Sequence, residues 1–264
     1  MAFRNEDRIP PDAKAVAQRL IILKHRFKKT IATPPPDCLA QWMKNWSGHD
    51  QVKFTAKMQE LYDRQIQELR AIGLWDGMEK EEQDFLAAGP TEISMQSYID
   101  GNWLAESIVC LLWALGFVPN LPAYDEQVMG KGKTHLTKLP PKLLDEKLAL
   151  RPAHGIARER EIAELWHWRS RTRRLQQEGR MPDQFPGGLN LDQMLQMVST
   201  KAAHDGLIPT PIAADFPAFG KPYRDLTPEE YSIATSIAIE RHRAFNWLCG
   251  YAPGNYWVRT PTDT

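Results

Sequence analysis

Two stretches of the sequence share one pattern. The first is Glu106-Ser-Ile-Val-Cys-Leu-Leu-Trp113-Ala-Leu-Gly116-Phe117-Val-Pro119, and the second is Glu240-Arg-His-Arg-Ala-Phe-Asn-Trp247-Leu-Cys-Gly250-Tyr251-Ala-Pro253. A glutamate, a tryptophan, a glycine, an aromatic residue and a proline occupy matching places in the two. Because glycine commonly ends a helix and proline commonly follows that end, the pattern predicts two helices that stop at Gly116 and Gly250. Duplication and a shared packing rule would both explain the likeness.

Helical patterns dominate the rest of the sequence. Thr227-Pro228-Glu229-Glu230 has the form of a capping box with proline in the first turn, and it begins the second of these helices, which ends at Cys249. Apolar residues at helical spacing predict further helices over residues 12–31, 50–72, 79–88, 93–115, 140–150, 155–177 and 191–204, and a short one capped by Asp37. Strand patterns are nearly absent. We therefore expect an all-α fold, a single compact multi-helix domain with long Pro/Gly-rich loops. An N-terminal helical arm (residues 1–48) would precede a helical core domain (residues 49–264).

The composition is that of an ordinary globular protein, with 42% hydrophobic and 25% charged residues in 264. Lys+Arg and Asp+Glu each number 33, and this balance argues against a nucleic-acid or membrane-surface protein built on bulk charge. The three cysteines have no close spacing, so we expect free thiols in a reducing compartment. The N-terminus has no apolar segment typical of a signal peptide, and no apolar run reaches the roughly 18–20 residues of a membrane span. The cytoplasm is the expected location.

Several segments are similar to one protein family. The residues that carry the likeness are Glu106 to Gly116, the helix from Glu240-Arg241 to Asn246-Trp247 with the closing Thr262-Asp263-Thr264, the segment Glu79 to Leu86, and the helix Ile162 to Arg169. They resemble the bacterial family known as domain of unknown function 4272, over most of the chain from about residue 50 onward. The resemblance implies a soluble helical domain of mostly bacterial origin. It implies no activity, because the family has none to transfer.

Glu106 and Glu240 occupy equivalent places, each seven residues before a tryptophan. Seven residues are about two helical turns, so each glutamate lies on the face of its tryptophan. One hypothesis is a two-carboxylate catalytic or metal site. The other, which we favour, is that each glutamate pairs with an arginine or caps backbone groups, because a buried carboxylate is costly unless paired. A cation would need more oxygen ligands than these two, so we predict no metal and no cofactor.

His167 and His242 are two further catalytic candidates. A histidine beside charged residues can carry a proton near neutral pH, but more often it is a satisfied polar residue on a half-buried helix. The sequence contains no zinc-protease motif, phosphate-binding loop or nucleophile motif. The residues that we expect to contribute to binding are Trp103, Trp113, Arg169, Arg241, Asn246, Trp247 and Asp263.

Residues 166–174 combine two tryptophans with Arg169, Arg171, Arg173 and Arg174. Such a mixture can bind phosphates and stack on bases. Glutamates precede it, however, and the chain is neutral, so a solvated helix end is favoured and we do not expect a nucleic-acid partner.

The function stays unknown from the sequence, with three hypotheses. The leading one is a non-enzymatic accessory or protein-interaction protein, whose partner is another protein or a second copy of the chain. It rests on nine tryptophans, Pro-rich loops and the absence of a catalytic motif. The alternative is a small-molecule or metal-dependent enzyme with a Glu/His/Arg site between the two repeat helices. The weakest is nucleic-acid binding through residues 169–174. We expect no membrane partner and lean toward no enzymatic activity.

Overall fold

The computed structural model describes residues 8–129, 138–139, 143–144, 147–182, 184–185 and 187–263. Its α-helices are α1 (Ala13–Ala32), α2 (Pro36–Asn45), α3 (Gly48–Ala71), α4 (Lys80–Ala87), α5 (Met95–Ala114), α6 (Ala153–Gln177), α7 (Leu191–His204) and α8 (Pro228–Leu248). Short helical turns cover Trp75–Gly77, Tyr223–Asp225 and Pro253–Asn255. Strands β1 (Pro217–Ala218) and β2 (Lys221–Pro222) form one small antiparallel pair. The expected all-α fold is confirmed.

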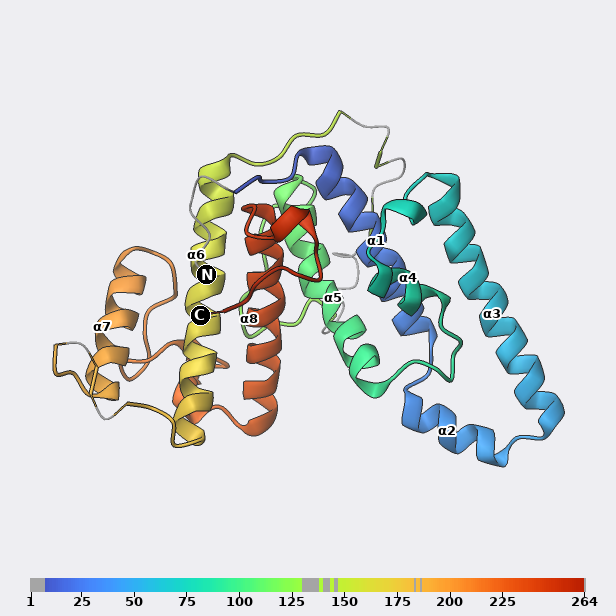
Figure 1. Ribbon diagram of the computed structural model, residues 1–264. Helices are drawn as coiled ribbons and strands as arrows, with labels where there is room; N and C mark the ends of the chain where they lie inside the picture. The colour runs from blue at the N-terminus through green and yellow to red at the C-terminus, as the bar shows by residue number, and fades with distance from the viewer. Residues whose placement is uncertain are drawn as a thin grey trace.

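Helix α5 lies at the centre of the arrangement. Figure 1 shows the longer helices in the order α7, α6, α8, α5, α1 and α3 across the molecule. Helix α5 packs against α1 on one side and α8 on the other, and α6 packs against α8. Residues 104–114 of α5 are all buried. A helix that is apolar all round has to be covered all round, and the two neighbouring helices do this for α5.

Gly101 allows the close contact between α1 and α5. Glycine inside a helix costs about 1 kcal/mol relative to alanine, yet α5 continues through this position. A Cβ atom built on Gly101 would collide with the side chain of Thr30 on α1. The missing side chain therefore brings the two helices together.

The glycines of the repeated pattern end both helices in the same way. Gly116 and Gly250 have positive φ values of 80° and 76° and follow the last turn of α5 and α8. The amides of the glycine and of the following aromatic residue bond back to the helix, which is the Schellman arrangement. The bonds run from Gly116 to Trp113 (2.9 Å), Phe117 to Leu112 (2.9 Å), Gly250 to Trp247 (3.0 Å) and Tyr251 to Asn246 (2.9 Å).

Most predicted helix limits agree with the structure, and two predictions differ from it. The capping box at Thr227 is present, because its hydroxyl accepts from the amide of Glu230 while the Glu230 carboxylate accepts from the amide of Thr227. Asp37 is not the cap of α2: the helix begins after Pro35, and Asp37 lies in the first turn. The helix expected over residues 140–150 is not found in its described part, where 143–144 form a turn and 147–150 are irregular. The rest of that segment lies outside the described residues.

The N-terminal segment divides between the core and a projection. Helix α1 packs along α5, whereas α2 has a smaller contact with α5 and leads to the beginning of α3, which projects from the core (Figure 1). Within α2, Leu39 is the buried residue. Among the described residues, no helix combines the length and the apolar character that crossing a membrane requires.

Candidate functional site

Helices α5 and α8 cross where their glutamates lie. Glu106 Oε2 accepts hydrogen bonds from Nε (3.0 Å) and Nη2 (2.8 Å) of Arg241, the residue after Glu240. Glu240 Oε2 accepts one from the hydroxyl of Ser107, the residue after Glu106 (2.9 Å). Each glutamate is thus held by the neighbour of the other. The repeated pattern marks a local two-fold contact between the two helices.

The Glu106–Arg241 pair also fixes the loop that follows α5. The other carboxylate oxygen of Glu106 accepts from the amide of Val128 (2.7 Å), and Arg241 Nη1 donates to the carbonyl of Pro122 (2.6 Å). The guanidinium lies 4.8 Å from the ring centroid of Tyr124. Both charged groups are buried. Removing one member of such a pair costs about 3–5 kcal/mol because the other charge is left without a partner, so these bonds have a structural role.

Glu240 takes part in a second ion pair. Its Oε1 accepts from Nη1 of Arg243 on the next turn (2.6 Å). Burial raises the pKa of Glu240, and the charge of Arg243 and the hydroxyl of Ser107 offset this only in part. Both glutamates therefore have an arginine partner. Within the described ranges there is no group of three or more His, Cys, Asp or Glu placed to hold a metal ion.

His167 on α6 and His242 on α8 meet in the interior, with their Nδ1 atoms 3.0 Å apart. Asn246 determines which ring donates. Arg160 Nε can only donate and the carbonyl of Pro261 can only accept. The Oδ1 atom of Asn246 therefore faces Arg160 (2.7 Å) and its Nδ2 faces Pro261 (2.8 Å).

The amide orientation of Asn246 fixes the protons of both rings. Its Nδ2 lies 3.0 Å from Nε2 of His242, so that nitrogen accepts a hydrogen bond and carries no proton. Neutral His242 then donates from Nδ1 to His167, whose own proton is on Nε2. Burial lowers the pKa of His242 to about 3 and that of His167 to about 4. Both rings are therefore neutral at pH 7, and the pair is not a base poised near neutrality.

The C-terminal tail is bound by Glu79, the residue that precedes α4. The carboxylate of Glu79 accepts from the amides of Trp257 (2.6 Å) and Val258 (3.0 Å) and from Nη2 of Arg19 (3.2 Å). Burial raises the pKa of Glu79, and these hydrogen bonds work against the rise. The tail therefore lies across the molecule, held by a residue far from it in the sequence.

Trp247 contacts the C-terminal tail, and Asp263 belongs to it. The Nε1 atom of Trp247 donates to the carbonyl of Asn255 (3.0 Å), and its ring meets the ring of Trp257 edge-on at 5.6 Å. Asp263 is exposed, and its charge acts on His167. Thr264 lies outside the described residues.

The two candidate tryptophans of α5 have different surroundings. Trp103 is half-buried and, with Glu106, Gln127 and Met129, lines an open cavity of about 310 Å³. Trp113 is buried and packs edge-to-face on Phe245 of α8, with ring centroids 5.8 Å apart. Trp113 therefore belongs to the core, whereas Trp103 borders open space.

The arginines of residues 169–174 do not form one surface. Arg169 is fully buried and makes two hydrogen bonds to Asp215, at 2.6 and 2.7 Å. Burial acts to raise the pKa of Asp215, but Arg169 and the amides of Phe216 and Arg224 together outweigh it, and the pKa is lowered. Arg173 donates to the carbonyls of Tyr223 and Leu226, both at 2.7 Å. These two arginines hold the segment 215–226 instead of offering charge to a ligand.

Several connecting residues were not singled out from the sequence. Glu79 anchors the tail, and Arg160 joins the histidine pair to Tyr251, whose ring centroid lies 4.3 Å from its guanidinium carbon. Arg8 donates to the hydroxyl of the same tyrosine (2.6 Å). No spacing could have revealed these contacts, because their members lie far apart in the chain.

Comparison with known proteins shows one match. No curated protein and no solved structure matches the chain. The family model described as "Domain of unknown function (DUF4272)" matches residues 5–195. This range includes α1 to α6, and it stops short of α8 and of the C-terminal residues on which the resemblance partly rested. Since the match covers well over half of the sequence, the chain belongs to the DUF4272 family.

Proposed function

We propose that the protein is a non-enzymatic interaction protein that binds a partner protein through the α2–α3 arm, defined as residues 36–57. One observation carries the proposal: the arm holds an aromatic cluster that the rest of the chain covers only in part. The ring of Trp46 lies 6.3 Å from that of Trp42 and 5.1 Å from that of Phe54, measured between centroids. Trp42 remains 45% exposed.

The arm contributes little to the core of the chain. Leu39 is the buried residue of α2, and Val52 at the start of α3 is 70% exposed. Tryptophan is enriched among the residues that dominate binding energy at interfaces. A contiguous apolar cluster rimmed by polar residues is typical of an interaction surface. The arm is therefore better explained by a partner that covers it than by the stability of the isolated chain.

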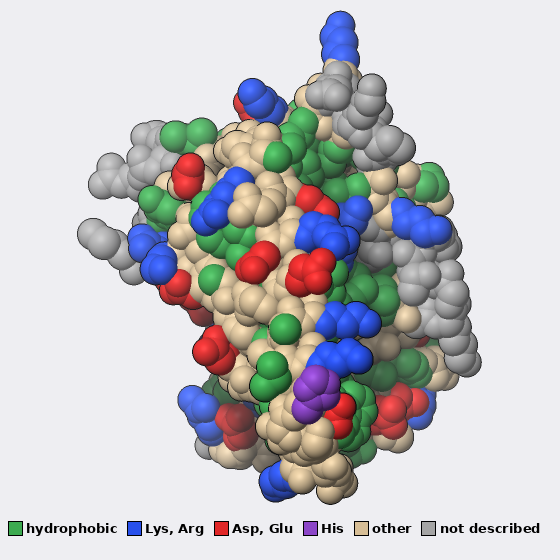
Figure 2. All heavy atoms as spheres, turned by 90° about the vertical axis from the view of Figure 1, so that its right-hand side faces the viewer, with side chains coloured by type: hydrophobic (Ala, Val, Ile, Leu, Met, Phe, Trp, Pro, Cys, Tyr) green, Lys and Arg blue, Asp and Glu red, His purple; other side chains and the backbone are tan. Residues whose placement is uncertain are grey.

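Charge favours one kind of partner. Lys44, Lys53 and Lys57 are exposed in the arm and outnumber its two exposed carboxylates, Asp37 and Asp50. We infer that the partner segment is apolar and acidic, because it would then cover the rings and meet the lysines. Figure 2 faces the side of the molecule where α3 lies, and basic, acidic and apolar side chains are interspersed there. A broad field of one sign, which supports nucleic-acid binding, is not seen on this face.

The residues suggested for catalysis also support a non-enzymatic role. Glu106 and Glu240 are engaged with Arg241 and Arg243, and the histidine pair is neutral and internally bonded. A general base needs free access to its proton donor and a pKa near the working pH. The geometry therefore favours interaction over the enzyme hypothesis.

The proposal is tested by placing a photo-crosslinking amino acid at position 42 and irradiating living cells of the source bacterium. Thr200, an exposed residue of α7, is the matched control position. We expect one heterologous adduct from position 42 and none from position 200. Mass spectrometry of the adduct then gives the partner segment.

The identified segment is next synthesised and titrated against the wild-type protein, Trp42→Ala, the triple charge reversal at Lys44, Lys53 and Lys57, and the control Met197→Ala. Met197 is an apolar residue outside the arm with an exposed fraction of 54%, close to that of Trp42. Loss of about tenfold or more in affinity for the arm variants alone supports the proposal. An adduct of twice the chain mass would show that the arm binds a second copy of the chain instead of another protein. The absence of any adduct at position 42 would contradict the proposal.

A further inference from the structure

A second feature, independent of the arm, is a cavity of about 460 Å³ between α6, the end of α8 and residues 8–10. Small-molecule sites usually measure about 300–1,000 Å³. The apolar part of the lining is formed by Pro10, Leu150, Ala153, Ile156, Ala157 and Leu248. The charged side chains that line it are all arginines, namely Arg8, Arg151 and Arg160. The cavity is thus apolar with a basic edge.

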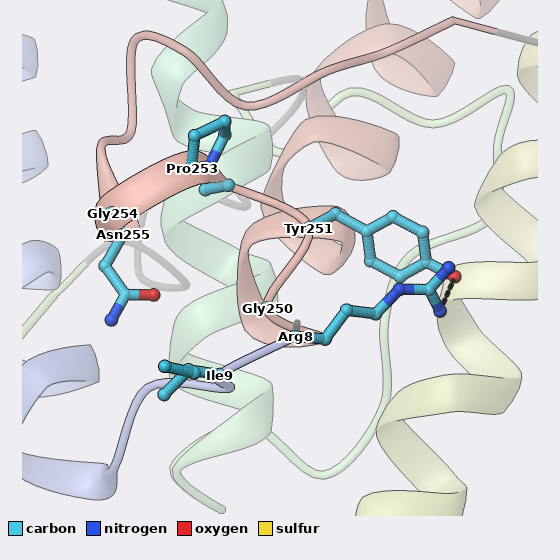
Figure 3. A pocket seen from close by; sticks show the side chains of 8 residues that line it. Arg8, Ile9, Gly250, Tyr251, Pro253, Gly254 and Asn255 are labelled. Carbon is cyan, nitrogen blue, oxygen red and sulfur yellow. Dashed lines mark hydrogen bonds between the residues drawn. The ribbon is translucent and has the colours of Figure 1, made fainter. Parts of the chain in front are cut away.

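Two of the arginines share one tyrosine. The guanidinium carbons of Arg8 and Arg160 lie 3.7 and 4.3 Å from the ring centroid of Tyr251. Figure 3 shows Arg8 extended along this ring, with its guanidinium at the hydroxyl that accepts its 2.6 Å hydrogen bond. The Nε atom of Arg8 is buried without a hydrogen-bond partner. Two positive groups at one ring, one of them incompletely bonded, favour an anion beside them.

The beginning of α6 adds positive potential on the same side. Ala153, the first residue of α6, lines the cavity. The preceding Pro152 provides no side-chain cap, and the first turn contains no acidic residue. The amides of Gly155 and Ile156 donate to the carbonyl of Pro152, and the preceding amides of Ala153 and His154 are left to attract an anion.

The arginines differ in how far they are already engaged. Arg151 donates to the carbonyls of Trp113 (2.7 Å) and Val118 (3.1 Å) at the end of α5. Arg160 is paired with Glu164 at 3.1 Å. Arg8 bonds to a neutral hydroxyl, so it is the arginine best placed to bind a ligand directly.

We propose that this cavity binds a small amphipathic anion, a molecule that carries a carboxylate or phosphate head group on an apolar body. The head group lies against Arg8, Tyr251 and the start of α6, and the apolar body lies along Ile156, Ala157 and Leu248. Arginine suits both head groups, because its planar fork of N–H donors binds their oxygens in pairs.

The probes for the test are octanoate and octyl phosphate, which separate the two head groups, with octanol and inorganic phosphate as controls. Titration calorimetry on the full chain is expected to show saturable one-to-one binding of at least one of the octyl anions. Octanol, which lacks the charge, and inorganic phosphate, which lacks the apolar body, bind at least tenfold more weakly. Added salt weakens the binding of the anion.

Two variants locate the site without removing a contact of the core. Arg8→Met keeps the stem and removes the charge, and Ala157→Trp fills the cavity from the surface of α6. Arg8→Met is expected to lower the affinity by about tenfold or more, because hydrogen bonds to charged groups are stronger than neutral ones. Ala157→Trp is expected to lower it by a similar factor, because the indole ring occupies the space of the apolar body. Arg180→Met, at an exposed arginine away from the cavity, leaves the affinity unchanged.

The outcomes are distinct. Tighter binding of octyl phosphate or of octanoate identifies the head group. Equal binding of octanol and the octyl anions, or anion binding that survives both Arg8→Met and Ala157→Trp, overturns the proposal. So does the absence of saturable binding by either anion, provided that unfolding curves show the wild-type chain to be folded.

Discussion

The hydrogen bond between His167 and His242 has a direction that is imposed from outside the pair. Arg160 and the carbonyl of Pro261 orient the amide of Asn246, and this amide leaves His242 only one nitrogen to protonate. A second proton on His167 would place two N–H groups against each other across the 3.0 Å gap between the rings, and a second proton on His242 would face the Nδ2 amide of Asn246 at 3.0 Å. The neutral state is therefore enforced by geometry as well as by burial.

This constraint predicts how stability depends on pH. The folded pKa values of His167 and His242, about 4 and about 3, lie below the usual value of 6.5. Above about pH 6.5 neither state binds the proton. As the pH falls toward 4, the unfolded chain takes up protons that the folded chain excludes. Each histidine should therefore lower the free energy of unfolding by about 1.4 kcal/mol per pH unit.

The variant His167→Gln tests this prediction, because glutamine still accepts the proton of His242 but does not titrate. Urea unfolding at pH 7, 6 and 5 should show a shallower loss of stability for the variant, by about 1.4 kcal/mol per pH unit below pH 6. The comparison removes the contribution of the carboxylates, which both proteins share. Parallel curves would contradict the proposed neutral pair.

At the scale of the elements, the two repeat helices end alike but in different surroundings. Gly116 has open space where a Cβ would lie, whereas a Cβ on Gly250 would lie 2.7 Å from backbone atoms of both Ile9 and Pro10. Both glycines have positive φ. Gly116 therefore serves the backbone turn alone, whereas Gly250 also leaves room for the backbone of the N-terminal segment.

The substitutions Gly116→Ala and Gly250→Ala separate these roles. The first should cost about 1–2 kcal/mol, the strain of a side chain in the left-handed region. The second adds a backbone collision and should cost at least about 1 kcal/mol more. Urea unfolding of the two variants measures the difference, and equal costs would show that the close approach of Ile9 is not required.

Local patterns predicted the elements better than they predicted the site. Helix limits followed from apolar spacing and glycine stops, and the all-α fold followed from them. The prediction that Asp37 caps α2 was wrong, because the helix already begins at Pro36, one residue before Asp37. The pairing of Glu106 with Arg241, rather than with any arginine nearer in sequence, depends on how α5 and α8 cross. No spacing within one helix contains that information.

At the scale of the molecule, α5 is covered by two helices that lie far apart in the sequence. Helix α1 precedes it, and α8 follows it after a long interval. The family match ends at residue 195, before α8 begins. A fragment of residues 8–195 should therefore leave one face of α5 bare and its Glu106 without Arg241.

We expect this fragment to lack cooperative unfolding and to bind a hydrophobic dye, unlike the chain of residues 8–263. Near-ultraviolet circular dichroism and thermal scans of the two provide the measurement. A fragment with native-like spectra and a sharp transition would show that α8 is not needed for the core.

The order in which the helices are synthesised also matters, because α5 is made long before α8, which covers it. A ribosome that adds about 5–20 residues per second releases α5 on the order of ten seconds before α8. During that interval the nascent chain exposes the apolar face of α5 that α8 later covers. We therefore expect the nascent chain to be prone to aggregation, or to bind a chaperone, until the last helix leaves the ribosome.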